Sequence, residues 1–186
     1  MISPVQVHLL LNHILTAGLG IALLLLLLAE VRRGSGLAQA GWIVLITATA
    51  FAVPTYLTGE AAEEAIKHLP GVAEELIETH EERALIALIL TLLGGVLGLV
   101  SLWTAYTLDR TPRLLALATL LVVLGGAGAM AWTGNAGGKI RHPEIGAAMA
   151  STTGRGRMGG KRGPVRSSLK KREPGEKGIH DASMVR

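Results

Sequence analysis

The chain has no cysteine among its 186 residues. This absence excludes disulfides, cysteine-ligated iron–sulfur clusters, covalently attached c-type haem and thiolate copper sites as properties of this chain. Charge is also scarce: Asp, Glu, Lys and Arg make up 17% of the residues, whereas a soluble chain usually carries about a quarter. Hydrophobic residues reach 49%. This composition favours a membrane protein over a soluble helical bundle.

Four long stretches of the chain contain no charged residue: Pro4–Ala29, Gly34–Gly59, Ala84–Leu108 and Leu114–Gly138. At about 1.5 Å per residue, each helix would be long enough to cross a hydrocarbon core of roughly 30 Å. We therefore predict an all-α fold, a bundle of four transmembrane helices, with spans at about 5–29, 37–58, 83–108 and 113–135. Short connections place these spans in one domain, residues 1–146.

The parts outside the spans differ in character. The second loop, Gly59–Arg83, alternates apolar residues with Glu at near-helical spacing and contains Pro70. This pattern predicts two short helices on the membrane surface, the second running unbroken into the third span. Residues 147–186 are rich in Gly, Ser, Lys and Arg, which predicts a disordered basic tail. The tail suits contact with anionic lipid, and its lack of aromatic residues that stack on bases argues against nucleic acid.

The short loops set the expected orientation. Arg32 and Arg33 follow the first span, and Arg110 and Arg113 lie between the third and fourth. By the positive-inside rule these loops are cytoplasmic, which places the N-terminus and the second loop outside a plasma (inner) membrane. The ten Lys and Arg of the tail point the other way, but charges far from a span influence topology less. The N-terminus MISPVQVH lacks a basic signal-peptide region, so we expect the first span to be retained.

Glycine and proline mark special positions inside the spans. Gly94 and Gly98 form a GxxxG motif, and Gly18 interrupts the first span. In lipid such residues let helices approach closely, which is the interpretation we favour, and they could also make room for a haem macrocycle. Pro54 predicts a kink in the second span.

Five of the six histidines fall where they can share one membrane face: His8, His13, His68, His80 and His142. Each crossing reverses the chain, so the start of an odd span and the end of an even span lie on the same side. Histidine binds metals and haem iron and titrates near neutral pH. The clustering therefore predicts a histidine site at the extracytoplasmic face.

His13 is the first candidate ligand. It lies about nine residues after Pro4, roughly 13 Å along a helix, and so inside the apolar layer, where an imidazole needs a partner. That partner is either a metal or a hydrogen bond to Asn12 or to a backbone carbonyl across the bundle. His8 is five residues from His13 and diverges from it around the helix, and His68 lies on a surface segment, so both are weaker candidates.

His80 and His142 come from two other elements and have carboxylates beside them. Together with His13, Glu81 and Glu144 they could hold Fe, Zn or Cu. Alternatively, two of the imidazoles could ligate a b-type haem while Arg141 pairs with its propionates. We expect His13 and His80 as ligands, His142 as a third, and supporting roles for the residues Glu81, Glu144, Arg141 and Asn12. No HExxH motif specifies the metal.

At these residues the chain resembles a family of uncharacterised bacterial four-helix integral membrane proteins. The corresponding segments are Asn12-His13, Tyr56-Leu57-Thr58-Gly59-Glu60, His80-Glu81-Glu82 and GGKIRHPE, within about Val5 to Ile145. Members look like cytochrome b-type bundles, so the resemblance implies haem. The chain departs from many haem bundles because no second histidine lies on the cytoplasmic half of any span, which argues against two haems in series.

The expected function is electron transfer through one b-type haem or a transition metal, exchanging electrons with a periplasmic carrier, a membrane quinone or another subunit of a membrane complex. A second possibility is a structural or assembly subunit whose histidines are only locally hydrogen-bonded. A small metal-ion or proton transporter ranks third, because spans two to four contain no charged residue. Stand-alone hydrolytic catalysis has little support, since no nucleophile stands beside a histidine.

Overall fold

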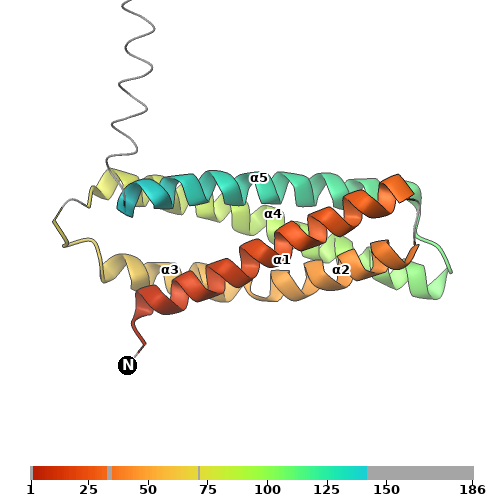
Figure 1. Cartoon of the computed structure of the whole chain (residues 1–186), viewed down its shortest axis with the longest axis horizontal. Helices are drawn as coiled ribbons and strands as arrows, with labels where there is room; N and C mark the ends of the chain where they lie inside the picture. Colours follow the sequence, from red (N-terminus) through yellow and green to blue (C-terminus); the bar gives the residue numbers. More distant parts are fainter. Residues whose placement is uncertain (1, 33–34, 71, 142–186) are drawn as a thin grey trace, which may run out of the picture. The chain divides into compact units, whose positions relative to one another are not determined.

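The computed structural model describes residues 2–32, 35–70 and 72–141, and this part of the chain contains helices and turns but no strand (Figure 1). The helices are α1 (Pro4–Arg32), α2 (Ser35–Ala50), α3 (Ala52–Glu64), α4 (Glu74–Thr107) and α5 (Arg113–Arg141). Because α3 continues α2, the described residues form four helical segments that are long and apolar enough to cross a membrane. The prediction of an all-α fold with four such segments is confirmed.

The second segment is divided at Phe51. Pro54 has no N–H to donate to the carbonyl of Ala50, so the regular hydrogen bonding of the helix cannot continue through this turn. The Phe51 N–H instead donates to the Ala48 carbonyl at 3.0 Å, one residue closer than in an α-helix. The Thr55 hydroxyl donates to the Phe51 carbonyl at 2.7 Å. The break agrees with the kink that Pro54 predicts.

The acidic second loop is organised differently from the prediction. Its first part does not form a separate short helix, because α3 runs on to Glu64 and turns then follow as far as Pro70. Gly59, where the uncharged run ends, lies within α3, and its missing side chain leaves room for His8. The second part begins α4 at Glu74 and continues unbroken to Thr107, as predicted.

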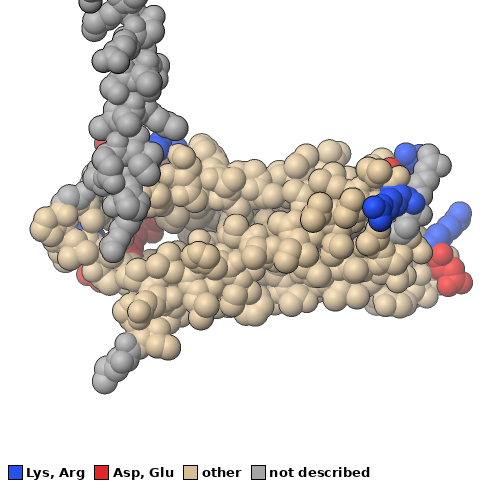
Figure 2. Space-filling model, in the orientation of Figure 1, with Lys and Arg blue, Asp and Glu red and all other residues tan. Residues whose placement is uncertain are grey.

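The helices form two hairpins that pack on each other. In one hairpin α1 lies along α2 and α3, and in the other α4 lies along α5 (Figure 1). The hairpins meet through α2 on α4 and through α1 on α5, whereas α3 packs less extensively on α4. Figure 2 shows the result, an opening between the hairpins at the α3 end with acidic side chains beside it.

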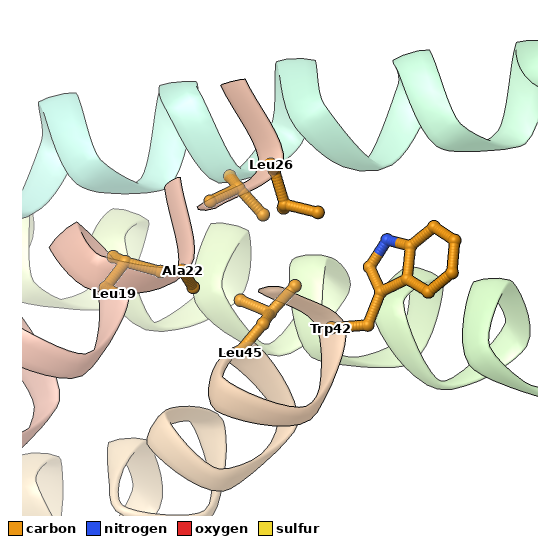
Figure 3. Close-up of a cluster of buried hydrophobic side chains, with 6 residues drawn as sticks. Leu19, Ala22, Leu26, Trp42 and Leu45 are labelled. Carbon is orange, nitrogen blue, oxygen red and sulfur yellow. The ribbon is translucent and has the colours of Figure 1, made fainter. Parts of the chain in front are cut away.

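The interior between the hairpins is built around six buried residues (Figure 3): Leu19, Ala22, Leu26, Trp42, Leu45 and Val123. Many large apolar side chains face outward instead, among them Leu24, Leu57, Val96 and Leu121. Because lipid tails are as apolar as leucine, an outward leucine has no free-energy cost in a membrane. Helix association therefore depends on close packing and on hydrogen bonds between helices. This explains why small residues occupy the contact surfaces.

Several glycines lie at these close contacts. A Cβ built on Gly18 would lie 2.7 Å from the Ala48 Cβ, and one built on Gly98 would lie 2.9 Å from Leu45 Cδ2. By contrast, Gly20 has no such neighbour within 4 Å. The structural interpretation is confirmed for Gly18, where only hydrogen fits beside the Ala48 Cβ. At Gly98 a methyl group would force the Leu45 side chain to move.

A buried hydrogen bond joins α4 to α5. The hydroxyl oxygens of Ser101 and Thr119 are 3.0 Å apart, and both side chains are inaccessible to solvent. Thr119 also donates to the Leu115 carbonyl of its own helix at 2.8 Å, so Ser101 is the donor in the bond between the helices. Such a bond has no competing water in an apolar layer and fixes the register of the hairpin.

We predict that Gly95→Ala weakens the contact between α2 and α4. The new Cβ would lie 2.5 Å from Thr49 Cγ2 and 2.9 Å from the Thr49 Cβ, which no side-chain rotation can move. The helices must separate, at a cost of about 1–3 kcal/mol in the free energy of unfolding. Denaturation of the detergent-purified protein by SDS, followed by circular dichroism, measures this change.

Gly128→Ala is the matched control, because Gly128 lies in α5 with nothing within 4 Å of its Cβ position. It should leave stability unchanged or slightly raised, since alanine has the higher helix propensity. Equal stability of the two variants would contradict the close approach of α2 and α4.

Candidate functional site

His13, the first expected ligand, points away from the other helices. Its imidazole is exposed, and Nδ1 lies 2.6 Å from the Leu9 carbonyl oxygen, one turn earlier in α1. The ring is therefore paired with a backbone carbonyl, one of the partners that the sequence allows, but that carbonyl belongs to its own helix. Asn12 beside it is half-buried. Nothing in this geometry brings His13 toward a site inside the bundle.

His8, which the sequence placed second to His13, faces inward. Its ring is half-buried against α3, with Nδ1 3.0 Å from the Thr55 carbonyl oxygen and 3.4 Å from the Thr58 hydroxyl. The divergence of His8 from His13 around the helix was correctly predicted. The structure shows that His8, not His13, is on the side that meets the bundle.

His80 makes the corresponding contact in the other hairpin. Its Nδ1 lies 3.1 Å from the Thr133 carbonyl oxygen of α5. One turn further along α4, the Arg83 guanidinium stacks over the Trp132 ring at 4.3 Å, and its Nη1 is 3.5 Å from the Trp132 carbonyl oxygen. These contacts fix the start of α4 to the last turns of α5.

The two hairpins thus repeat one arrangement. In each, a histidine near the start of the first helix bonds to a threonine carbonyl on the second, and a glycine four residues after that threonine lies against the imidazole. The sets are His8, Thr55 and Gly59 in the first hairpin, and His80, Thr133 and Gly137 in the second. A Cβ on the glycine would lie 3.5 Å from the imidazole Cε1 in the first set and 3.1 Å in the second.

The hydrogen bonds determine which nitrogen of each ring carries the hydrogen. A carbonyl oxygen can only accept, so Nδ1 of His8 and Nδ1 of His80 must each carry the hydrogen. In a neutral imidazole this leaves the lone pair on Nε2, the atom that binds a metal. The site therefore presents two oriented imidazoles, one from each hairpin, at the end where the hairpins diverge.

Several carboxylates lie near this end. Glu81 is exposed and lies close to Glu63 of α3. Glu64 forms an ion pair with Lys67, and this bond raises the pKa of the Lys67 ammonium. Glu81, which the sequence suggested as a metal ligand, thus lies beside a second carboxylate at the surface.

In the described part of the chain, no group of three or more His, Asp or Glu side chains could hold a metal ion. A non-haem centre made of His13, His80 and Glu81 is therefore not assembled there. The remaining expected ligands, His142 and Glu144, lie outside the described residues, as do the side chain of Arg141 and the tail 147–186.

Comparisons of the chain with family models, with curated proteins and with solved structures found no match. The class of the protein is therefore described by its fold and its site. It is a bundle of two helical hairpins with segments of membrane-spanning length. Each hairpin contributes one oriented histidine at the same end of the bundle.

The partners of these histidines were not predicted from the sequence. Thr55 and Thr133 are both buried, and each is followed four residues later by glycine. The signal was present as a repeat: a histidine opening an odd span, and Thr-x-x-x-Gly closing the even span that follows it. It is short, and it stands out only once the helices are known to be paired.

We predict that Gly137→Ala displaces the His80 imidazole. The added methyl group would lie 3.1 Å from Cε1 and 3.2 Å from Nδ1, closer than a relaxed contact allows. The hydrogen bond to the Thr133 carbonyl should lengthen, which shifts the imidazole nitrogen resonances of His80 in ¹⁵N NMR spectra.

Gly138→Ala, one residue later in α5, is the control because nothing lies within 4 Å of its Cβ position. Its spectrum should match that of the wild type. If the two alanine variants give the same His80 resonances, then Gly137 does not position this ring.

Proposed function

We propose that this protein is a multi-pass protein of the plasma (inner) membrane, with its N-terminus outside. The support is the four apolar segments and the position of the arginines. Arg32 ends α1, and Arg110 and Arg113 lie at the turn from α4 to α5. Figure 2 shows Lys and Arg side chains at that end of the bundle. The positive-inside rule makes this end cytoplasmic and the His8 and His80 end extracytoplasmic.

We propose further that His8 and His80 together bind one b-type haem and that the protein transfers electrons. One observation carries the proposal: both imidazoles donate Nδ1–H to a carbonyl within their own hairpin, which leaves both Nε2 atoms as ligands. A porphyrin supplies four nitrogen ligands to iron, so two imidazoles complete the coordination. Haem therefore suits the two oriented histidines better than a metal ion, which needs three or four side chains.

The surroundings of the rings fit this role. Histidines that bind metals almost always donate their other N–H to a carbonyl, carboxylate or water, because this bond orients the ring and raises its basicity. Gly59 and Gly137 lie against the rings, where a larger side chain would crowd them. The hairpins diverge at this end, which gives the two ligands separate supports (Figure 2).

Other expected residues keep supporting roles in the proposal. Asn12 is one turn from His8 on α1, so it lies on nearly the same side of the helix. Arg141 would pair with haem propionates at the water boundary. Haem, when bound, supplies one-electron chemistry, while the protein holds it and excludes water. A site at one face suits exchange with a periplasmic carrier, a membrane quinone or a neighbouring subunit.

A structural subunit is the second candidate, and the same hydrogen bonds favour it. Each imidazole already has a partner across its hairpin, which is sufficient reason for a histidine at a helix contact. In that case His8 and His80 would stabilise the bundle, and the purified protein would contain no haem.

We predict that the purified wild-type protein shows b-type bands in a reduced-minus-oxidised visible spectrum. His8→Ala and His80→Ala should each remove most of the bound haem, because one axial ligand is lost. His13→Ala is the matched control, because the His13 ring is exposed and bonds only to the Leu9 carbonyl of its own helix. This variant should keep the wild-type spectrum.

A methionine in place of either ligand separates coordination from packing. Haem iron accepts Met with His, so His80→Met should retain haem with altered bands and a raised reduction potential. Absence of haem in the wild type, or equal loss of haem in the His13→Ala and His8→Ala variants, would refute the proposed ligand pair and leave the structural role.

A further inference from the structure

A cavity of about 450 Å³ lies at the end of the bundle opposite to His8 and His80. It is bounded by the last turns of α1 and α4 and the first turns of α2 and α5. Small side chains make the space: Ala29, Ala38, Ala105 and Ala116 come from all four of these helices. Pockets that bind small organic ligands have about this volume and are mostly apolar.

Trp42 supplies an unusual polar group to this cavity. Its side chain lines the space and is only 3% exposed. Its indole Nε1–H is buried and has no hydrogen-bond partner among the described residues. Figure 3 shows the nitrogen-bearing edge of the ring directed toward Leu26, another wall residue. The nitrogen itself has almost no accessible surface, so an acceptor in the cavity reaches it only when the Leu26 side chain moves aside. A buried donor without an acceptor costs free energy, and such an acceptor would remove this cost.

The charged groups of the wall nearly cancel one another. Glu30 Oε1 lies 3.4 Å from Arg113 Nη2, which pairs one acid with one base. Among the described residues of the wall, Asp109 and Arg110 are the other two that carry charge. These described groups, two acidic and two basic, have no net charge together. The ligand that the cavity suits is uncharged, with an apolar body and one hydrogen-bond acceptor.

We propose that this cavity binds an uncharged membrane amphiphile through a carbonyl oxygen that accepts the Trp42 N–H. Its apolar body would lie among the four alanines. This carbonyl chemistry has two sources in a membrane: a quinone ring and the ester carbonyl of a neutral glycerolipid. The inference does not rest on the proposed haem site, because it uses different residues at the other end of the bundle.

The first test uses tryptophan fluorescence of the full chain in detergent. Trp103→Phe together with Trp132→Phe leaves Trp42 as the only tryptophan of the three. Both replaced residues are exposed, and phenylalanine at position 132 keeps an aromatic ring beside the Arg83 guanidinium. A short-chain ubiquinone should quench Trp42 fluorescence and reach saturation. In this background, Ala105→Leu should raise the dissociation constant at least tenfold by filling the cavity, and Ala38→Leu provides a second variant on α2 should the first fail to fold.

The second test follows binding without relying on Trp42 as the reporter. In equilibrium dialysis with the same quinone, Trp42→Phe keeps the ring but removes the donor, so binding should weaken roughly fivefold, as expected for one hydrogen bond. Trp103→Phe, which removes an exposed ring, should bind as the wild type does. His8→Ala should also bind normally, which separates this site from the haem proposal.

Native mass spectrometry distinguishes the two sources. Saturable quinone binding identifies a quinone, whereas a retained neutral glycerolipid that disappears in Ala105→Leu identifies the lipid, and either result upholds the carbonyl site. Quenching that rises linearly without saturation and no retained lipid would mean that the cavity holds only water. That result, or wild-type binding by both Trp42→Phe and Ala105→Leu, overturns the proposal.

Discussion

A polar group inside an apolar bundle must find its partner on the bundle itself, and most of this structure follows from that constraint. The hydroxyls of Ser101 and Thr119 satisfy each other between α4 and α5. His8 and His80 satisfy Nδ1 on carbonyls of α3 and α5. Lipid gives apolar side chains little reason to associate, so these bonds hold the helices of each hairpin together. The close contacts of Gly95 and Gly98 with α2 join the two hairpins.

The same constraint makes a contact between helices a candidate ligand-binding site. A carbonyl partner fixes the imidazole by one nitrogen and leaves the other free, so structural support and ligand capacity come from one bond. The arrangement occurs once in each hairpin, and the hairpins diverge at that end (Figure 2). At the opposite end the constraint is not met within the described residues, because the Trp42 N–H has no acceptor. The two ends of the bundle therefore differ in what they offer a ligand.

Much of the fold could be predicted from the sequence, because the signals were strong and local. Uncharged runs marked the four spans, and Pro54 marked the kink near Phe51. The separate loop helix expected before Pro70 was not found, because α3 continues through Gly59, which lies against the His8 imidazole, as far as Glu64. Helix ends depend on such contacts and cannot be read from propensity alone.

The candidate site was predicted only in part. His80, an expected ligand, does lie against α5, but His13 was preferred to His8 because it lies deeper in the apolar layer. Depth follows from sequence position, whereas the direction of a side chain depends on how the helix is rotated. In α1 apolar residues are spread around nearly all sides, so no polar face indicates that rotation. The cavity beside Trp42 needs four helices in place and has no local signal.

Electron paramagnetic resonance of the oxidised, detergent-purified protein tests the central claim most directly. Two imidazoles on one haem iron predict a low-spin ferric signal, lost in His8→Ala and in His80→Ala and retained in His13→Ala. A high-spin signal in the wild type, or a low-spin signal that survives removal of His8, would contradict ligation by one histidine from each hairpin.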